Sequence, residues 1–359
     1  MATLDELRRR IDALDEQLVT LLNERAAIAV EIGRVKRGTG VGVFAPERER
    51  EVLQRVTALS KGPLSRTALT TIYKELMSAS FALQRAPRVG CLGPAGSFSH
   101  EAALGRFGSS VEYELRVDIR GVVEDVANGR LDYGVVPVEN STGGAVLDTL
   151  DAFTNYDVRV CSEMTRAIRH HLLANCRQDE ITVVYSKPEA FSQCQRWLSE
   201  TGLSRKISPA PSTSKAAEMA AQQPHAAAIG SALAAKLYSL KILAPNIQDN
   251  PNNATRFLVL GGDGSRPTGN DRTSLFFITA HHAGALVNVL LVFQKAGINM
   301  TMITSRPHAS GESQYCFFAD IDGHADEEPI KSAVETARTH CAVLRVLGSY
   351  PKSTEIMTE

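Results

Sequence analysis

Thr255 and Arg256 close a polar stretch whose residue types suit the binding of a small polar ligand. The stretch runs from Asn246 to Phe257 and holds five amide side chains, one proline and no long apolar residue between its second and last positions. Such a composition excludes a core strand or an amphipathic helix. It leads into an apolar strand predicted over 257–260. Thr255 and Arg256 are therefore expected at the rim of a sheet, where ligands of open α/β sheets bind. An asparagine-rich surface turn is the alternative.

A second set of chemically useful side chains lies in the first 85 residues. Apolar residues recur there in alternating steps of four and three, and position 25 of this seam is an arginine. A charged side chain on an apolar seam is costly unless a partner or ligand neutralises it. Ser80 and Gln84 prolong the apolar stripe of a later helix, so two hydrogen-bonding groups face inward. Arg25 therefore belongs either to a buried arginine–carboxylate pair or to a ligand site.

Three helices are predicted to position these residues. Thr3 and Glu6 form a capping box that starts a helix running almost to Gly38. Pro46 opens a second helix, and a third begins near Ser65.

The length of the first helix predicts dimerisation. A helix of about 34 residues is about 50 Å long, and the two shorter helices cannot cover its seam. Arg8 and Arg25 lie about 25 Å apart along this helix. Both can serve one small ligand only if Arg8 comes from an antiparallel partner chain.

From Pro87 onward, short strands are followed by small-residue turns and helix starts. This succession occurs five times. Helix N-termini capped by Ser, Thr and Asn carry exposed N–H donors that suit carboxylates, although ordinary capping explains any single one. Together they predict a two-lobed sheet domain with a cleft. The turns lie at 93–99, 139–144, 186–189, 212–214 and 230–231.

The composition is that of a soluble protein with neither nucleic acid nor membrane as partner. The net charge is -1 and 22% of residues are charged, which is average. Six scattered cysteines indicate reduced thiols in a cytoplasmic protein. The adjacent pairs His170-His171 and His281-His282 point different ways, so no metal site is expected. The charged N-terminus is not a signal peptide, and no apolar run approaches the roughly 18 residues of a membrane span.

The helical layout resembles the all-helical chorismate mutase family, an intertwined dimer. That family rearranges chorismate to prephenate without base, nucleophile or metal. The reaction needs a dianion held in a compact shape and donors near the breaking ether bond. Arginines clamp the carboxylates, and Lys36 and Gln84 are the implied donors to the ether oxygen. Ala45 replaces a frequent aspartate, and we expect weaker orientation of a neighbouring cation or substrate hydroxyl. The positions that match the family's ligand contacts are Arg8, Arg25, Lys36, Arg48, Glu49, Ser80 and Gln84.

The central part resembles the prephenate dehydratase family, whose signatures appear in order at 93–99, 136–142, 212–217, 228–231 and 253–257. The implied fold is two lobes like a type II periplasmic binding protein, with the site between them. Thr255 is the implied main catalytic residue, supported by Glu139, Asn140 and Gln193, with Arg256 beside it. Lys187 stands where the family often has histidine. The implied substrate-binding residues are Ser97, Ser99, Ser141, Thr142, Ser212, Thr213, Ser214 and Phe257.

The implied reaction removes carbon dioxide and hydroxide from prephenate and gives phenylpyruvate. A threonine hydroxyl is too weak an acid to ionise at neutral pH, but it can donate a hydrogen bond to the leaving oxygen. Glu139, if buried and protonated, is the other candidate acid. We favour Thr255, with Asn140 and the helix N-termini holding the carboxylates.

Residues 263–270 have the composition of a linker. The elements expected after it are a strand (273–280), a helix (283–296), two strands (298–305 and 314–321), a helix (326–340) and a strand (343–350). This βαββαβ order is ferredoxin-like, and the block resembles an ACT domain, a module that binds amino acids. The resemblance implies a phenylalanine site between paired domains, and a purely structural dimerisation module is the alternative. Thr304 replaces the usual glutamate, so we expect altered effector affinity. The implied effector-binding residues are Gly284, Ala285, Leu286, Val287, Asn288, Thr304, Ser305, Arg306 and Pro307.

Three successive blocks therefore cover the chain: a mutase domain (1–86), a dehydratase domain (87–265) and an ACT domain (272–359). The resemblance predicts a homo-oligomeric bifunctional enzyme of phenylalanine biosynthesis, inhibited by L-phenylalanine, without metal or organic cofactor. One rival is a dehydratase that prefers arogenate, the amino analogue of prephenate. Another is a non-catalytic ligand sensor, against which Thr255, Arg25, Lys36 and Gln84 argue.

Overall fold

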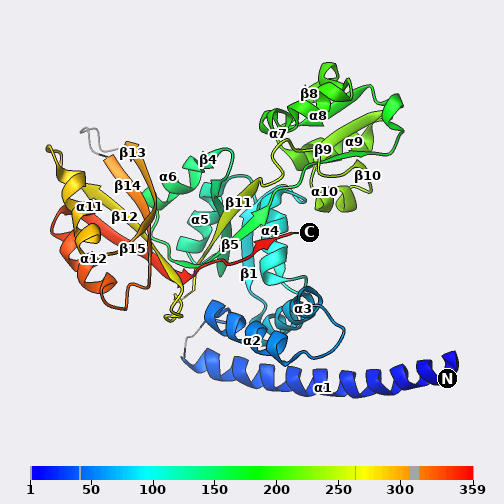
Figure 1. Cartoon of the computed structure of the whole chain (residues 1–359), viewed down its shortest axis with the longest axis horizontal. Helices are drawn as coiled ribbons and strands as arrows, with labels where there is room; N and C mark the ends of the chain where they lie inside the picture. Colours follow the sequence, from blue (N-terminus) through cyan, green and yellow to red (C-terminus); the bar gives the residue numbers. More distant parts are fainter. Residues whose placement is uncertain (1, 40–41, 263, 308–314, 359) are drawn as a thin grey trace.

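The computed structural model describes residues 2–39, 42–262, 264–307 and 315–358. We refer to α1–α3 as the helical region, to β1–β11 as the central region and to β12–β16 as the C-terminal region. Figure 1 shows the helical region beneath the central region. The C-terminal region lies to the left of the first sheet (β1–β5 and β11), and the second sheet (β6–β10) lies to its right. Two predicted positions, Asp263 of the linker and Gln314 of a strand, lie outside the described residues.

The three predicted helix starts of the helical region are confirmed. Thr3 N donates to Glu6 Oε2 at 2.8 Å, and Glu6 N donates to Thr3 Oγ1 at 3.3 Å. Pro46 opens the second helix, and Ser65 caps the third by accepting from the N–H of Ala68. The helices are α1 (Leu4–Thr39), α2 (Pro46–Leu59) and α3 (Arg66–Arg85).

α1 and α3 cross closely, because α1 carries a glycine at the crossing. A Cβ atom on Gly33 would lie 2.8 Å from the Cα of Gln84. Outside this crossing, much of the apolar seam of α1 faces solvent, and Figure 1 shows that the helix extends well past its neighbours. The exposed apolar residues of the helix are Leu4, Leu7, Ile11, Leu14, Leu18, Val19, Leu21, Ile28, Ile32 and Val35.

The first sheet of the central region has the strand order β16-β5-β11-β3-β1-β2. β1 is parallel to β2 and β3, whereas β11 is antiparallel to its neighbours β3 and β5. The first-sheet elements are β1 (Arg88–Leu92), α4 (Phe98–Phe107), β2 (Glu112–Arg116), α5 (Ile119–Ala127), β3 (Tyr133–Asn140), β4 (Gly144–Ala145), α6 (Leu147–Asn155), β5 (Val160–Ala167) and β11 (Ala254–Leu260).

The second sheet has the order β10-β6-β9-β7-β8 and is joined to the first by the segments that follow β5 and β10. Two separate sheets agree with the predicted two-lobed domain. The elements are β6 (His171–Ala174), η1 (Gln178–Glu180), β7 (Val183–Ser186), α7 (Pro188–Gln193), α8 (Gln195–Glu200), η2 (Leu203–Arg205), β8 (Ile207–Pro209), α9 (Thr213–Gln222), β9 (Ala226–Gly230), α10 (Ala232–Leu237) and β10 (Lys241–Ala244).

Two of the five predicted strand-to-helix turns differ from the prediction. Residues 139–144 form a hairpin in which β3 pairs with β4, since Gly144 supplies the positive φ of 75° that the turn needs. At the next turn Ser186 does not cap α7; its hydroxyl donates to the carbonyl of Ile229 at 2.8 Å. The expectation of five hydroxyl-capped helix N-termini was therefore wrong.

The C-terminal region has the predicted βαββαβ order of elements, in a sheet ordered β13-β14-β12-β15. The chain then returns to the first sheet, where β16 pairs in parallel with β5 (Figure 1). The described residues contain no helix long and apolar enough to span a membrane. The elements are β12 (Asp271–Thr279), α11 (Ala285–Lys295), β13 (Met300–Pro307), β14 (Tyr315–Asp322), α12 (Ile330–Arg338), β15 (Cys341–Pro351) and β16 (Ile356–Met357).

Candidate functional site

Thr255 is the second residue of β11 and is only 7% exposed. Its Oγ1 accepts a hydrogen bond of 2.8 Å from Asn140 Nδ2, directly opposite on β3. The same amide nitrogen donates to Asn253 Oδ1 at 3.0 Å. Asn253 Oδ1 also accepts from the hydroxyls of Ser141 and Thr142, each at 3.4 Å. These five side chains form one group, which we call the amide cluster.

The backbone after β3 fixes the orientation of the Asn140 amide. Its Oδ1 accepts from the N–H groups of Thr142 at 2.9 Å and Gly143 at 2.8 Å. The Nδ2 group must therefore face Thr255. Because this nitrogen donates to Thr255 Oγ1, the threonine hydroxyl keeps its own proton for another acceptor. Within the described part of the chain, no hydrogen bond has Thr255 Oγ1 as its donor.

Gln193 and His170 connect the amide cluster to the second sheet. Gln193 Oε1 accepts from Asn253 Nδ2 at 3.0 Å and lies 2.9 Å from His170 Nε2. Since a carbonyl oxygen can only accept, Nε2 carries the ring proton. Burial lowers the pKa of His170 to about 4, so the ring is neutral at pH 7.

Sequence reasoning missed Asn253 and His170 as members of this site. We considered the histidine only as a metal ligand, and a contact between lobes leaves no periodic signal. Asn253 lay within the amide-rich stretch and within a family signature, and these signals were sufficient to select it.

Arg256 and Glu139 do not join the amide cluster, which corrects the prediction that they lie around Thr255. Successive residues of a strand face opposite sides, and Glu139 is the cross-strand partner of Arg256. Arg256 Nε lies 3.4 Å from Glu139 Oε2. Its two Nη atoms donate to Glu163 of β5 at 3.1 Å and to Asp320 of β14 at 2.6 Å. Glu139 is about half exposed, so it is not the buried carboxylic acid that we considered.

Further hydrogen bonds extend this group into the C-terminal region. Glu163 accepts from Arg272 Nη1 at 2.6 Å, and Asp320 accepts from the Ser274 hydroxyl at 2.5 Å. Burial alone would lower the pKa of Arg256, but the carboxylates of Asp320 and Glu163 raise it. We call Arg256, Glu163, Arg272, Ser274 and Asp320 the Arg256 cluster.

Phe257, predicted to bind substrate, lies in the core. It is 1% exposed and packs with residues that include Phe107 of α4 and Val89 of β1. β11 starts at Ala254, so Phe257 is an interior strand residue and cannot reach a ligand at the strand's end.

Serine side chains from two of the predicted turns, 212–214 and 230–231, form hydrogen bonds between the two lobes. The Ser214 hydroxyl donates to the carbonyl of Ala95, and the Ser231 hydroxyl donates to the carbonyl of Gly96 at 2.8 Å. α9 and α10 of the second lobe thus contact the turn after β1.

The other predicted hydroxyl residues have different environments. Ser97 and Ser212 cap α4 and α9 by accepting from backbone N–H groups at 3.1 and 3.0 Å. Ser99 is buried, and Thr213 is partly exposed. These residues position the segments around the lobe junction.

In the helical region, Arg25 faces α3. Its Nη1 lies 2.8 Å from Ser80 Oγ and 3.4 Å from the carbonyl of Leu76. No carboxylate of the described residues forms a salt bridge with it, so the alternative of a buried pair is not seen within one chain. Gln84 Oε1 is buried without a hydrogen-bond partner in the described structure. An unpaired cation and an unpaired acceptor therefore occur on the same α1–α3 interface.

The remaining predicted mutase residues do not converge on Arg25. Lys36 Nζ donates to the carbonyls of Gly42 and Val43 at 3.0 and 2.9 Å. Glu49 is buried, and its carboxylate accepts from Arg106 of α4 at 2.5 Å. Within one chain, Glu49 therefore contacts the central region.

Two arginines of this set are exposed and have local partners. Arg48 pairs with Glu51 at 2.8 Å, one turn away on α2. Arg8 lies 3.6 Å from Asp5 near the free end of α1. Neither residue contributes to a site within one chain.

The two predicted effector motifs do not line one cavity within one chain. Residues 284–287 line a cavity of about 320 Å³ together with Tyr315 and Phe317, whereas residues 304–307 do not line it. Asn288 lines a different cavity. Arg306 makes two hydrogen bonds to Asp151 of α6, at 2.7 and 2.6 Å.

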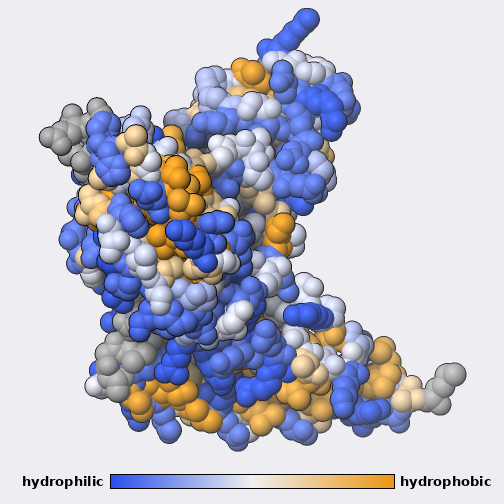
Figure 2. Space-filling model, turned by 60° about the vertical axis from the view of Figure 1, so that its left-hand side comes forward, coloured by the Kyte–Doolittle hydropathy of each residue, from blue (hydrophilic) through white to orange (hydrophobic). Residues whose placement is uncertain are grey.

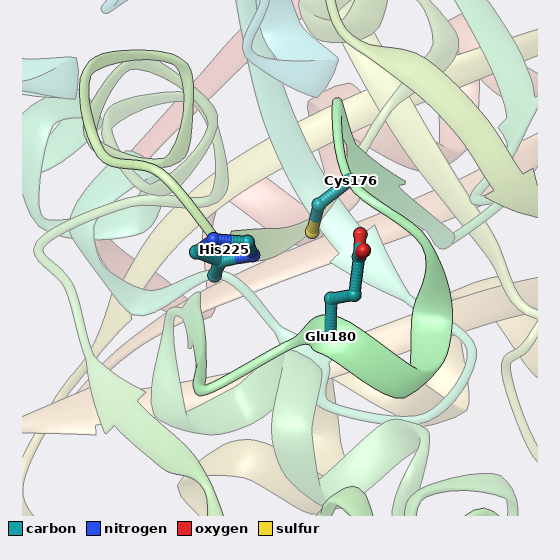
Figure 3. Close-up of side chains that lie close together, drawn as sticks. All are labelled: Cys176, Glu180 and His225. Carbon is teal, nitrogen blue, oxygen red and sulfur yellow. The ribbon is translucent and has the colours of Figure 1, made fainter.

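Cys176, Glu180 and His225 form the one group of described residues with side chains suited to a metal ion (Figure 3). Their ligand atoms lie within 4.8 Å of one another, although the sequence spacing gave no hint of it. Glu180 already accepts from the Arg177 N–H at 2.9 Å, and burial raises the pKa of the Cys176 thiol. The group lies away from the amide cluster, and we assign it no role.

Comparison with protein families identifies two parts of the chain. Residues 7–85 match the family model of chorismate mutase type II, and residues 89–265 match that of prephenate dehydratase. The regions of Arg25 and of the amide cluster thus belong to two different enzyme families.

Relatives match over nearly the whole chain. The bifunctional chorismate mutase/prephenate dehydratase of Aquifex aeolicus is 42% identical over 358 residues, covering 98% of this chain and 99% of its own. The enzyme of the same description from Escherichia coli K12 is 33% identical, covering 96% and 95%.

Two solved structures resemble about three quarters of the chain. Prephenate dehydratase from Arthrobacter aurescens in complex with L-Phe has a TM-score of 0.69 and 30% identity, covering 74% of this chain and 90% of its own. GqqA, described as a novel type of quorum quenching acylase, also has a TM-score of 0.69, with 26% identity, covering 74% and 98%. The fold alone therefore does not fix the reaction, but the two family matches and the full-length relatives do. The chain belongs to the family of bifunctional chorismate mutase/prephenate dehydratases, enzymes of aromatic amino acid biosynthesis, and has both activities.

Proposed function

We propose that Thr255 is the group that donates a hydrogen bond to the departing hydroxide of prephenate. The observation that carries this proposal is the hydrogen bond of 2.8 Å from Asn140 Nδ2 to Thr255 Oγ1. It occupies a lone pair of the hydroxyl and leaves its proton to point at an acceptor outside the cluster. A preorganised donor of this kind stabilises charge that develops on a leaving oxygen.

The remaining groups of the amide cluster bind and orient the substrate in this proposal. Ser141 and Thr142 lie where β3 turns into the hairpin, and Gln193 reaches them from the second lobe through Asn253. Closure of the two lobes would exclude water from the carboxylates.

The mutase site requires a second copy of the chain. Arg25 clamps one carboxylate of chorismate, and Gln84 and Lys36 serve the ether oxygen. Arg8 of a second copy completes the set, since the Arg8 of the same chain is about 25 Å from Arg25. The exposed apolar seam of α1 supports this dimer, and Figure 2 shows a hydrophobic band along the helical region.

The C-terminal region (residues 272–359) is proposed to be an ACT domain that binds phenylalanine and lowers dehydratase activity. Its βαββαβ order and the cavity at residues 284–287 support this assignment. The Arthrobacter dehydratase, which covers 74% of this chain, is described in complex with L-Phe. The two effector motifs would meet only across a pair of chains. The Arg256 cluster provides a physical route from this region to the strand that carries Thr255.

One experiment tests these assignments together. The purified protein receives chorismate alone, and chorismate loss and phenylpyruvate formation are followed with and without L-phenylalanine. We expect phenylpyruvate without added prephenate, and its suppression by phenylalanine. Uninhibited product formation would contradict the regulatory role.

A direct comparison of prephenate with arogenate as substrates completes the test. A higher kcat/KM for arogenate would replace the assignment of prephenate as the preferred substrate of the central region (87–265). Turnover of either compound excludes the non-catalytic sensor.

A further inference from the structure

A cavity of about 210 Å³ lies where the helical region meets the first sheet and the C-terminal tail. Its walls come from α2, α3, α4, β5 and residues 351–357, so all three regions contribute. Neither Thr255 nor Arg25 lines it. We call this cavity the tail pocket. In Figure 1 the tail passes from β15 to the first sheet above α3.

Three cationic side chains with unused donors line the tail pocket. Arg50 Nη1 and Arg106 Nε are buried and have no hydrogen-bond partner in the described part of the chain. Lys74 of α3 forms neither a salt bridge nor a hydrogen bond with the described residues. Burial lowers the pKa of Lys74, and Arg106 and Arg166 lower it further, against Glu49 and Glu355, which raise it.

The carboxylates that line the pocket are already engaged. Glu49 accepts from Arg106 Nη1 at 2.5 Å. Glu163 belongs to the Arg256 cluster. Glu355 lies 3.9 Å from Arg66, and both side chains are exposed. Among the described residues Arg50 therefore has no salt bridge, and Lys74 has only the longer-range attraction of Glu49 and Glu355, which is costly for partly buried cations.

We propose that the tail pocket binds a small dicarboxylate. A guanidinium group presents paired donors that match one carboxylate, and an ammonium group suits a second one. The hydroxyl groups of Thr57, Thr70 and Ser162 also line the pocket and can satisfy the remaining oxygens. The volume is below that of sites for drug-sized ligands, which start at roughly 300 Å³. A compact metabolite fits it.

Occupation of the tail pocket would tie the three regions together. A dicarboxylate between Arg50 and Lys74 would bridge α2 and α3, and it would also contact β5 and the tail. The tail pocket shares no lining residue with the cavity at residues 284–287, and neither Thr255 nor Arg25 lines it, so ligand binding there can be measured without turnover.

Malonate binding, measured by calorimetry on the full chain, tests the proposal. We expect Arg50→Met and Lys74→Met each to weaken one class of malonate sites at least tenfold. The matched controls Arg55→Met and Lys61→Met, which change exposed residues of the helical region, should leave all dissociation constants unchanged. Equal binding by all four variants and the wild type would overturn the proposal. Inorganic phosphate bound as tightly, with the same loss in both variants, would overturn the dicarboxylate assignment.

A crystallographic measurement tests the same site with the wild-type protein. Crystals of the full chain grown with bromomalonate should show an anomalous bromine peak between Arg50 and Lys74. A structure with bromine at either active site and none in the tail pocket would refute the site. Lys74→Met should fold, because an apolar side chain of similar length replaces a partly buried cation that has no salt bridge among the described residues.

Discussion

The two faces of β11 carry different kinds of side chain, neutral on one face and charged on the other. Thr255 and Phe257 face α4 and the amide cluster, where neutral amides and hydroxyls share hydrogen bonds. Arg256 and Leu258 face the C-terminal region, where charged groups meet above a shared hydrophobic core. Two consecutive residues of β11 therefore face different environments: Thr255 faces its proposed substrate, and Arg256 faces the C-terminal region.

If Thr255 has its proposed role, one strand serves both catalysis and the cohesion of the regions. Neutral amides keep fixed orientations without a charge to compensate, and they leave a hydroxyl proton free for the substrate. The Arg256 cluster is suited to the other task, because buried ion pairs are costly to break and so resist separation of the regions. Any shift of Asp320 relative to β5 would act on the residue next to Thr255.

Substitution of Arg256 by methionine should have the largest effect on stability. It leaves Glu163 and Asp320 buried with fewer counter-charges, which costs about 3 to 5 kcal/mol. Thermal melting of the variant and of the exposed control Arg55→Met measures this loss. Addition of Asp320→Asn to the variant should recover part of the stability. If Arg256→Met melts like the wild type, the Arg256 cluster does not stabilise the contact between the regions.

Substitution of Thr255 by valine should act on turnover and leave stability nearly unchanged. The change keeps the shape and removes the donor, so dehydratase kcat should fall about 100- to 1000-fold. Chorismate mutase activity of the same sample is the internal control and should stay at the wild-type value. A variant with near-normal phenylpyruvate formation would end the assignment of Thr255.

His170 should make the folded protein sensitive to mild acid. Its pKa is about 4 in the folded state, because of burial, against 6.5 in the unfolded chain. Below pH 6.5 the unfolded chain therefore binds a proton that the folded chain does not. Stability is complete above this pH and falls by about 3 kcal/mol as the pH drops toward 4. Urea titrations between pH 4 and 7 measure how the free energy of unfolding depends on pH. This dependence should be weaker for His170→Gln than for the wild type. It should be unchanged for the control His225→Gln, which alters an exposed side chain.

Substitution of Glu139 by glutamine should have the smallest effect. The carboxylate is about half exposed and lies on the Arg256 face, where such a pair contributes about 1 kcal/mol or less. Dehydratase kcat with prephenate should stay within about fivefold of the wild-type value. A loss comparable to that of Thr255→Val would restore Glu139 as the catalytic acid.

The helices were predictable because their signals are local. The capping box at Thr3 and Glu6, Pro46 and the Ser65 cap act within one turn, and each starts a helix where expected. The start of β11 was not predictable in this way. Ala254, Thr255 and Arg256 are strand residues because β3 and β5 pair with them on both sides, and this tertiary pairing overrides a polar, turn-like composition.

The wrong prediction of where β11 starts also explains which site residues were misplaced. With the strand assumed to begin at Phe257, Thr255 and Arg256 were expected at one loop rim, whereas strand alternation sends them to opposite faces. Glu139 follows Arg256 because the two are cross-strand partners. The Glu49–Arg106 pair joins two regions far apart in sequence, and no local pattern reports such a contact.

The pairing of β16 with β5 ties completion of the first sheet to a segment that is made long after its other strands. β5 and β11 precede Ile356 by many residues, so an edge of the sheet that carries Thr255 stays uncovered while the ribosome makes the C-terminal region. At about 5 to 20 residues per second, this interval lasts on the order of 5 to 20 s after β11 is made. A nascent chain with an open edge is prone to pair with other strands. β16 thus also covers this sheet edge late, after the whole C-terminal sheet has been made.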